Sequence, residues 1–312
     1  MPSFAVRPAA FADAPAICEL LNTIDELEIG RPETDLHEVQ ADLKQVEADL
    51  ARNSWLAHDE EGKLVAYGLL WDDSGAERID IDHYVLPDQQ VAGARLFELM
   101  ERRAAEKAAA NGAERAVVHL HLNSSPTLDL ALLEGRGWRR VRRYQVMTRE
   151  VSEATDPTPP ALPGLTLRTC EAEADRRLAH RLTEATMADH FDHQPRTYEQ
   201  WLLDLDAERL DWSLIWIATL AGRDVGVLLS RDDRQAMAWI RTIGVLAEAR
   251  GRGIAGHLLR HAFAVYAARG RDTAGLGVDV QNATGALRLY EAHGMRQHYA
   301  VDTWENTLGV AP

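Results

Sequence analysis

The amino-acid sequence predicts an α/β (α+β) protein of two tandem domains, each with a mixed, mostly antiparallel sheet flanked by helices. The first observation is a repeat: three pairs of segments recur in the same order, at offsets of 168 − 7 = 161, again 161, and 157 residues. The pairs are Phe4–Arg7 with Leu165–Arg168, Ser54–Ala57 with Ile215–Ala218, and Leu132–Trp138 with Leu289–Met295. The second observation is that strand-like and helix-like apolar spacings alternate along each copy. Duplication of a whole domain explains both observations.

In the first copy, alternating apolar residues indicate strands, and spacings of three and four residues indicate helices. We expect strands over Phe4–Arg7, Ser54–Ala57, Leu64–Leu70, Arg78–Leu86, Ala116–Leu122 and Arg139–Val151. We expect helices over Asp13–Asn22, Asp35–Arg52, Ala92–Asn111 and Leu128–Gly135. Asp13 is the expected N-cap of the first helix, and Gly112 the expected stop of the third. Both copies then have the order β-α-α-β-β-β-α-β-α-β.

Residues 152–164 separate the two copies and contain four prolines in thirteen positions. Proline at this density does not occur inside helices or central strands, because it lacks the amide hydrogen and fixes φ. We therefore expect an N-terminal domain over 1–151, a Pro-rich linker or covering strap over 152–164, and a C-terminal domain over 165–312.

Composition excludes several classes of protein. The 312 residues carry a net charge of −15, which disfavours nucleic acid or an anionic membrane as a partner. No apolar run reaches the ~18 residues of a membrane span, and the N-terminus lacks the pattern of a signal peptide, so we expect a cytoplasmic monomer or homodimer. Cys18 and Cys170 lie far apart and outside any metal-ligand spacing, and we expect both to be small buried side chains or inert thiols.

The stretch Ile243–Leu259 has the pattern of a phosphate-binding loop. A short apolar run ends at Val245, and the turn that follows leads through Gly251 and Gly253 into a helix. Glycine lets the backbone approach a ligand, and the first amides of a helix have no intrahelical acceptor. Together with the helix dipole and two arginines, these amides predict an anion site.

Two segments of the second half resemble the GNAT superfamily of acyl-CoA-dependent N-acyltransferases. Arg250-x-x-Gly253-x-Ala255 fits the pyrophosphate loop Q/R-x-x-G-x-G/A of that family, and Asp279–Met295 resembles its asparagine-to-tyrosine segment. The duplication is similar to that of the tandem members, mycothiol synthase among them. The resemblance implies acetyl-CoA as the co-substrate and no metal.

The resemblance also implies roles for individual residues. Gly244 and Val245 would bind the pantetheine arm, Asn282 would contact the pantetheine or the substrate, and Tyr290 would act as general acid on the sulfur. The pyrophosphate would lie on the amides of Arg250, Gly251, Arg252, Gly253, Ile254, Ala255 and Gly256. A phenol with a pKa near 10 stays protonated at neutral pH and can donate to a departing thiolate. The alternative is that Tyr290 only packs on one face of a short helix.

The general base is harder to assign, because the strand Met237–Gly244 lacks the carboxylate that many relatives carry there. Trp239 and Arg241 occupy alternating positions on this strand and are candidates for substrate contacts; Arg241 is equally a candidate for a surface ion pair. His190 is the candidate base and His193 a candidate substrate contact, since an unperturbed imidazole pKa suits proton transfer.

For two groups of histidines we also consider roles outside catalysis. Solvated positions are favoured over a metal site for the segment Ala188–His193. Packing or surface roles are expected for His119 and His121, which alternate on one strand.

The first copy departs from the pattern where chemistry would need it. Gln89 stands at the Arg250 position, Ala92 at that of Gly253, Ser125 at that of Asn282 and Leu133 at that of Tyr290. A methyl group then stands where a phosphate should approach. We therefore expect a silent N-terminal copy with a degenerate CoA loop.

The sequence thus predicts an N-acetyltransferase that moves acetyl from acetyl-CoA to the primary amine of a small molecule by direct attack in a ternary complex. The alternatives are mycothiol synthase itself and a non-catalytic, regulatory acyl-CoA-binding protein of the same tandem fold.

Overall fold

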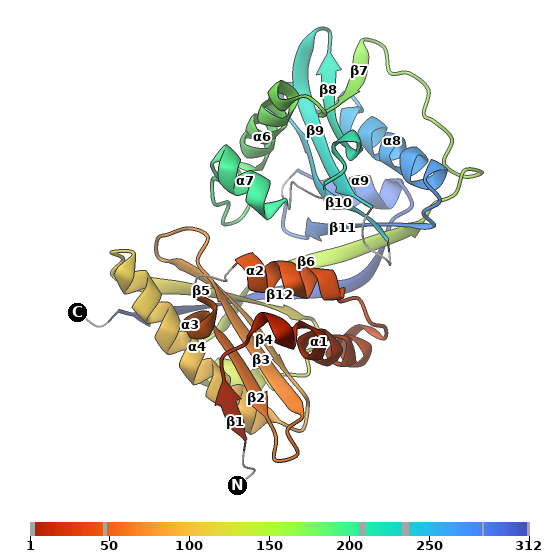
Figure 1. Ribbon diagram of the computed structural model, residues 1–312. Helices are drawn as coiled ribbons and strands as arrows, with labels where there is room; N and C mark the ends of the chain where they lie inside the picture. The colour runs from red at the N-terminus through yellow and green to blue at the C-terminus, as the bar shows by residue number, and fades with distance from the viewer. Residues whose placement is uncertain (1–3, 46–48, 206–209, 233–236, 283, 311–312) are drawn as a thin grey trace. The chain divides into compact units, whose positions relative to one another are not determined.

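The computed structural model describes residues 4–45, 49–205, 210–232, 237–282 and 284–310, which form two compact units. Unit 1 comprises Met1–Tyr144 together with Tyr299–Pro312, and unit 2 comprises Gln145–His298 (Figure 1). Each unit contains a mostly antiparallel sheet flanked by helices, so the predicted fold class is confirmed. Unit 2 follows the predicted order β-α-α-β-β-β-α-β-α-β, whereas unit 1 has three α-helices between its first two strands in the described residues.

Unit 1 has the strand order β1-β2-β3-β4-β5-β12-β6, in which β4 and β5 are parallel. Its strands are β1 (Ala5–Arg7), β2 (Ser54–His58), β3 (Leu64–Trp71), β4 (Arg78–Val85), β5 (Arg115–Asn123), the start of β6 (Arg139–Glu150) and the end of β12 (Arg296–Gly309). Its helices are α1 (Ala14–Ile29), α2 (Leu36–Gln45), α3 (Leu50–Asn53), α4 (Gln90–Ala110) and α5 (Leu130–Gly135). In Figure 1, β2–β4 run between α4 on one side and α1 on the other.

Unit 2 repeats this arrangement with the order β6-β11-β10-β9-β8-β7, in which β10 and β11 are parallel. Its own strands are β7 (Leu165–Thr169), β8 (Ile215–Leu220), β9 (Arg223–Arg231), β10 (Ala238–Val245) and β11 (Thr273–Asp279). Its helices are α6 (Glu173–Met187), α7 (Tyr198–Asp204), α8 (Ile254–Ala268) and α9 (Ala286–Ala292). Phe263 and Tyr266 of α8 are fully buried against the sheet and anchor this helix.

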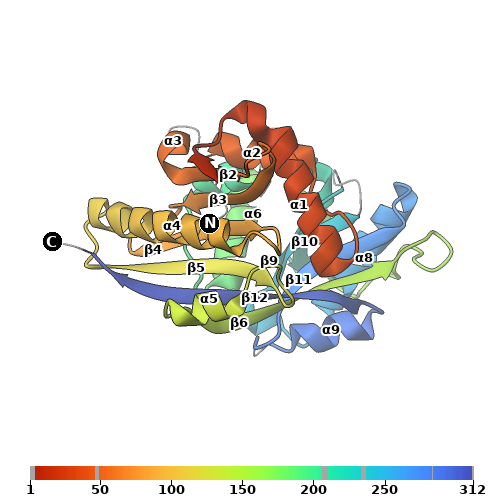
Figure 2. The ribbon, with the colours of Figure 1, turned by 90° about the horizontal axis from the view of Figure 1, so that it is seen from below.

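The structure draws the unit boundaries differently from the predicted 1–151 and 165–312, because β6 and β12 each pass from one unit into the other (Figure 2). Val301–Gly309 of β12 pair with Arg115–Asn123 of β5, so the chain end belongs to the sheet of unit 1. The Pro-rich residues 152–164 lie within unit 2. There Asp156 binds Arg149 at 2.8 Å and the Gly164 carbonyl accepts the Ala221 amide at 2.9 Å.

Three helix predictions needed correction. Asp13 is the N-cap residue of α1, but the helix continues to Ile29, seven residues past the predicted end, because Ile24 extends its buried face and Gly30 (φ 83°) ends it. The single helix predicted over Asp35–Arg52 is represented by α2 and α3, and residues 46–48 between them lie outside the described residues. Helix α4 begins at Gln90, two residues before the predicted Ala92.

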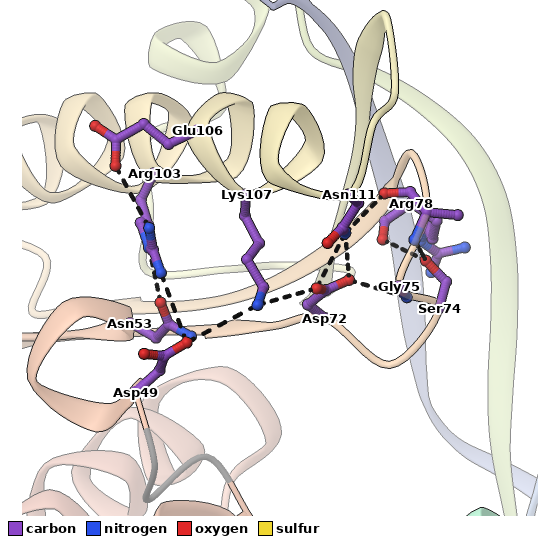
Figure 3. A network of polar contacts seen from close by, with 11 residues as sticks. Asp49, Asn53, Asp72, Ser74, Gly75, Arg78, Arg103, Glu106, Lys107 and Asn111 are labelled. Carbon is purple, nitrogen blue, oxygen red and sulfur yellow. Dashed lines mark hydrogen bonds and ion pairs between the residues drawn. The ribbon is translucent and has the colours of Figure 1, made fainter.

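A network of polar contacts fixes the C-terminal half of α4 in unit 1 (Figure 3). Arg103 donates to Asn53 Oδ1 at 2.8 Å, and Lys107 lies 3.3 Å from Asp72 and 3.9 Å from Asp49. Asn111 donates to Asp72 at 3.1 Å. These contacts join α3, α4 and the end of β3, and they hold the C-terminal half of α4 in place. In the described part of the chain, no helix is long and apolar enough to cross a membrane.

Candidate active site

The junction between β10 and α8 presents a row of unpaired backbone amides. Gly251 (φ 74°) and Gly253 (φ 77°) adopt the left-handed conformation, which a side chain would strain. The amide of Arg250 still donates to Ala247, and that of His257 to Gly253. In the described part of the chain, none of the amides of residues 251–256 has an acceptor. Six consecutive free N–H groups at a helix start form a concave donor surface for an anion.

A cavity of 290 Å³ opens beside these amides, lined by α6, the end of β10, the loop, the first turn of α8 and α9. Ten of the predicted site residues line it: His190, Gly244, Val245, Arg250, Gly251, Gly253, Ile254, Ala255, Gly256 and Tyr290. The remaining lining residues are Thr186, Met187, Ile243, Ala249, Thr284, Gly285, Ala286 and Leu289. The cavity thus combines an apolar wall with a polar floor of amides, the make-up expected of a small-molecule site.

Gly244 is required by packing as well as by access. A Cβ at this position would lie 2.1 Å from the Oγ1 of Thr186 and 2.6 Å from its Cβ. Thr186 cannot retreat easily, because its hydroxyl donates to the Leu182 carbonyl at 2.7 Å and it is buried in α6. Glycine therefore allows α6 to approach β10 at the cavity wall. The sequence did not single out Thr186.

Tyr290 is the one phenol among the residues that line the cavity. Its side chain is 6% exposed, and burial raises the pKa of its hydroxyl to about 12. It is therefore protonated at neutral pH and available as a donor. Position 290 lies in α9, whose N-terminal residue Ala286 follows Gly285 in the left-handed conformation (φ 75°).

His190 and Asn282 meet at the edge of the cavity. The Nδ2 of Asn282 donates to His190 Nε2 at 3.5 Å, while Asn282 Oδ1 accepts the Thr284 amide at 2.7 Å. The second contact fixes the orientation of the amide group, so Nε2 is the unprotonated nitrogen of His190. Burial lowers the pKa of this imidazole, against an opposing effect of Asp279, and a neutral ring is the dominant form at pH 7.

Other predicted site residues do not line the cavity. Arg241 binds Asp204, which also binds Arg196. Trp239 covers Gly275, where a Cβ would lie 3.0 Å from the indole ring. His193 binds Glu184 at 3.1 Å. Arg252 is exposed on the loop.

The side chain of Arg250 braces the loop rather than extending from it. Its Nε donates to the carbonyl of Val245 at 3.0 Å and so joins the two ends of the turn between β10 and α8. The sequence interpretation used both the amide and the side-chain charge of Arg250 for the anion site, whereas the structure directs the Nε of that side chain to the Val245 carbonyl within the loop.

His293 is a neighbour of the loop that sequence reasoning missed. A Cβ on Gly256 would lie 3.0 Å from the Cε1 and Nε2 atoms of His293. The lack of a side chain at Gly256 of α8 therefore makes room for the ring. His293 Nδ1 donates to the Leu289 carbonyl at 2.7 Å, which leaves Nε2 to accept from Arg260 at 3.1 Å. The motif ends at Ala255 and does not indicate which side chain fills the space beside Gly256.

The matching junction of unit 1 is closed. With the offset of 161, His83 corresponds to Gly244 (244 − 161 = 83), and its ring is 2% exposed, stacked on Phe97 at 4.0 Å. Its Nε2 donates to the Gly93 carbonyl at 3.0 Å. Helix α4 starts three residues earlier than α8 in this alignment, and the amides of Ala92 and Gly93 both donate to Gln89.

No metal centre accompanies either junction in the part of the chain that the structure describes, since no group of three or more His, Cys, Asp or Glu could hold an ion there. His119 binds Glu305 at 2.9 Å, and His121 contacts Thr303 at 3.1 Å. Both contacts join β5 to β12.

Comparisons with known proteins agree with this geometry. The sequence model of the acetyltransferase (GNAT) family matches residues 176–295. A GCN5-related N-acetyltransferase from Sphaerobacter thermophilus is 29% identical, with a TM-score of 0.81 over 99% of this chain and 96% of that chain. No curated protein sequence matches significantly.

Two more distant structures share the fold alone. A tandem GNAT protein of the clavulanic acid biosynthesis pathway is 16% identical, with a TM-score of 0.66 over 99% of both chains. A GCN5-related glucosamine N-acetyltransferase region of a fungal multi-domain β-N-acetylglucosaminidase is 14% identical, with a TM-score of 0.71 over 98% of this chain and 38% of that chain. The predicted resemblance to GNAT acetyltransferases is confirmed, whereas a specific likeness to mycothiol synthase is not.

Proposed function

We propose that this chain is a GNAT-type N-acetyltransferase and that unit 2 moves acetyl from acetyl-CoA to the primary amine of a small molecule by direct attack in a ternary complex. One observation carries the proposal: the free amides of residues 251–256, the protonated phenol of Tyr290 and the neutral imidazole of His190 border one cavity. Acetyl-CoA would supply the activated thioester, and the chain would supply anion binding, a donor and a base.

The loop fits the pyrophosphate because its donors are backbone amides without competing acceptors. Gly251 and Gly253 hold these amides in the left-handed turn, and Arg250 braces the turn through Val245. The exposed guanidinium of Arg252 adds positive charge in a chain whose net charge is −15. Phosphate binding here uses the start of α8 in the way helix N-termini bind anions generally.

Direct attack matches the residues that border the cavity, because neither cysteine nor serine is among them. Cys170 is buried elsewhere in unit 2, and burial raises the pKa of its thiol to about 12. In the proposed step the amine nitrogen attacks the carbonyl carbon, a C–N bond forms and the C–S bond breaks. The proton lost by the amine goes to His190, and the sulfur leaves as a thiolate.

His190 would take the amine proton on Nε2. This nitrogen is unprotonated and its contact with Asn282 is long, at 3.5 Å, so an N–H of the incoming neutral amine can replace it. Burial favours the neutral imidazole, which is the form that acts as a base. Asn282 would then position the ring through its own link to Thr284.

Tyr290 would stabilise the departing sulfur. A pKa of about 12 lies above the ~8.5 of an ordinary thiol, so complete proton transfer from phenol to thiolate is uphill. The larger part of the effect is then a charge-assisted hydrogen bond from Oη to the developing thiolate. Transfer of the proton completes as the product separates.

Initial-rate kinetics with acetyl-CoA and a panel of primary amines test the proposal. We expect CoA release that depends on both substrates, intersecting double-reciprocal lines and an N-acetylated product in mass spectrometry. Parallel lines or a trapped acetyl-enzyme would refute direct attack. In His190→Gln, we expect loss of the acidic limb of the pH–rate profile; a profile unchanged from wild type would exclude His190 as the base.

A further inference from the structure

The segment between α6 and α7 of unit 2 carries His190 and makes two successive turns. The amide of His190 donates to the Met187 carbonyl at 2.8 Å, and the amide of His193 donates to the His190 carbonyl at 3.2 Å. Asp192 has φ 51°, a left-handed conformation that is uncommon for residues other than glycine. His190 belongs to both turns, so the position of His193 bears directly on that of His190.

Glu184 of α6 holds the far end of these turns. Its Oε2 accepts the imidazole N–H of His193 at 3.1 Å and the amide N–H of Arg196 at 3.4 Å. One helical turn earlier in α6, the Nε2 of His180 donates to the Arg196 carbonyl at 2.8 Å. Residues 180 and 184 lie on the same side of α6, because four residues make about one turn of a helix. Two side chains of α6 thus hold residues 193–196 against that helix.

The side chain of His190 makes only one weak polar contact of its own. Among the described residues, its hydrogen bond is the contact of Nε2 with Asn282 at 3.5 Å, which is longer than an ordinary hydrogen bond. Its ring nonetheless lines the cavity together with Gly244 and Tyr290. The direction of the ring therefore depends mainly on the backbone of the two turns.

Unit 1 lacks this arrangement at the matching positions. With the offset of 161, Ile29 corresponds to His190 (190 − 161 = 29), and it is the last residue of α1. Thr23 and Pro32 stand at the positions of the carboxylate and of the second imidazole (184 − 161 = 23, 193 − 161 = 32). The carboxylate–imidazole contact thus occurs in the unit whose junction borders a cavity, where the first helix ends earlier and the chain turns.

We infer that Glu184, through His193 and the amide of Arg196, positions the imidazole of His190 at the cavity. The proposed function, on which this inference rests, makes His190 the base. Glu184 is then a positioning residue, because it does not line the cavity. His193 was predicted to contact the substrate, but its Nε2 proton is donated to Glu184 instead. Without the carboxylate the turns are released, and the ring of His190 spends less time where the amine arrives.

The surroundings of His190 give this position a measurable signature. Burial lowers the pKa of its imidazole. The charges of Asp279 and Asp189 raise this pKa, and those of His193 and Arg250 lower it. A ring released into solvent would lose the effect of burial, so its pKa would rise toward the ~6.5 of an unperturbed histidine.

The test is a pH titration of the full chain, labelled with ¹⁵N-histidine, in wild type and Glu184→Ala. The imidazole signals of His190 are identified by their loss in His190→Gln. In Glu184→Ala we expect these signals to move to the positions of an exposed ring, with a pKa close to ~6.5. Unchanged signals of His190 in this variant, measured on folded protein, would overturn the inference.

Two further variants separate the hydrogen bonds from a general effect of charge. Glu184→Gln keeps an oxygen that accepts from His193 and from the Arg196 amide, so we expect the His190 signals of wild type. Glu199→Ala, which removes an exposed carboxylate of α7, is the control and should also leave them in place. Signals displaced in Glu184→Gln or in Glu199→Ala as far as in Glu184→Ala would contradict the role of these contacts.

Steady-state kinetics distinguish this inference from the proposed function. In Glu184→Ala we expect kcat to fall about tenfold, because the base is misplaced, and the KM for acetyl-CoA to stay within about twofold. In the His190→Gln background, Glu184→Ala should lower kcat by no more than about twofold, since no base remains to be positioned. A further tenfold loss in that background would overturn the inference. Displaced His190 signals with an unchanged kcat would support the positioning and refute His190 as the base.

Discussion

The two strand–helix junctions of this chain have the same topology, but one borders a cavity and the other is filled by a side chain. In unit 2, Gly244 leaves a cavity and the amides of residues 251–256 are free. In unit 1, the ring of His83 occupies the matching position, and the amides of Ala92 and Gly93 in α4 donate to the Gln89 carbonyl. A loop with two left-handed glycines thus becomes an ordinary helix start when alanine replaces Gly253. The difference shows that the fold alone does not leave these amides free.

The largest effect is expected for Tyr290→Phe. Removing the hydroxyl removes the donor to the leaving sulfur, and we expect kcat to fall by about 100-fold or more. Steady-state CoA release with a good amine substrate measures this. Tyr266→Phe is the control, since that buried phenol of α8 does not border the cavity and should leave kcat within twofold. A kcat near that of wild type in Tyr290→Phe would remove the phenol from the mechanism.

The second effect concerns His83, which closes the loop of unit 1. Burial lowers its pKa to about 4. Below pH 6.5 the unfolded chain binds a proton that the folded chain does not, so this group costs stability as pH falls toward 4. The expected loss from His83 is about 3 kcal/mol, taken as ~1.4 kcal/mol per pKa unit.

Urea unfolding of wild type and His83→Gln at pH 7 and pH 4 isolates this contribution. Asp82 and Asp42 have raised pKa values and change stability in the opposite direction, but they do so equally in both proteins. The wild type should lose about 3 kcal/mol more than the variant. Equal losses would mean that the imidazole is not buried in neutral form.

A smaller effect is expected for Gly253→Val. Among the described residues, no atom outside the chain neighbours of Gly253 lies within 4 Å of a Cβ at this position, so the change acts through the left-handed backbone and through the space taken from a ligand. We expect the KM for acetyl-CoA to rise about tenfold and the stability to fall by about 1 kcal/mol. Ala92→Val in unit 1 is the matched control and should leave KM unchanged. An unchanged KM in Gly253→Val would show that the anion binds elsewhere.

Much of this comparison could be predicted from the sequence. The repeat offsets, the loss of glycine at Ala92 and the Leu133 in place of Tyr290 are local signals, and they predicted both the duplication and the contrast between copies. The element order followed from apolar spacing. Ten of the predicted residues lie around one cavity, because the motif places them on consecutive elements.

What could not be predicted depends on contacts between distant segments. The pairing of β12 with β5 joins residues about 180 apart, and no local pattern reveals it. The contact of Thr186 with Gly244 and the insertion of His293 beside Gly256 depend on how helices pack on the sheet. The offset of 161 aligns His83 with Gly244, but only the structure shows that the ring of His83 fills the position of the cavity.

The central claim is that one of two similar junctions binds the co-substrate. Calorimetric titration of the full chain with acetyl-CoA tests it directly, because the number of molecules bound per chain reports how many of the two loops bind acetyl-CoA. We expect one molecule per chain, with binding weakened about tenfold in Gly253→Val and unaltered in Ala92→Val. Two molecules per chain, or one that remains fully bound in Gly253→Val, would contradict the account.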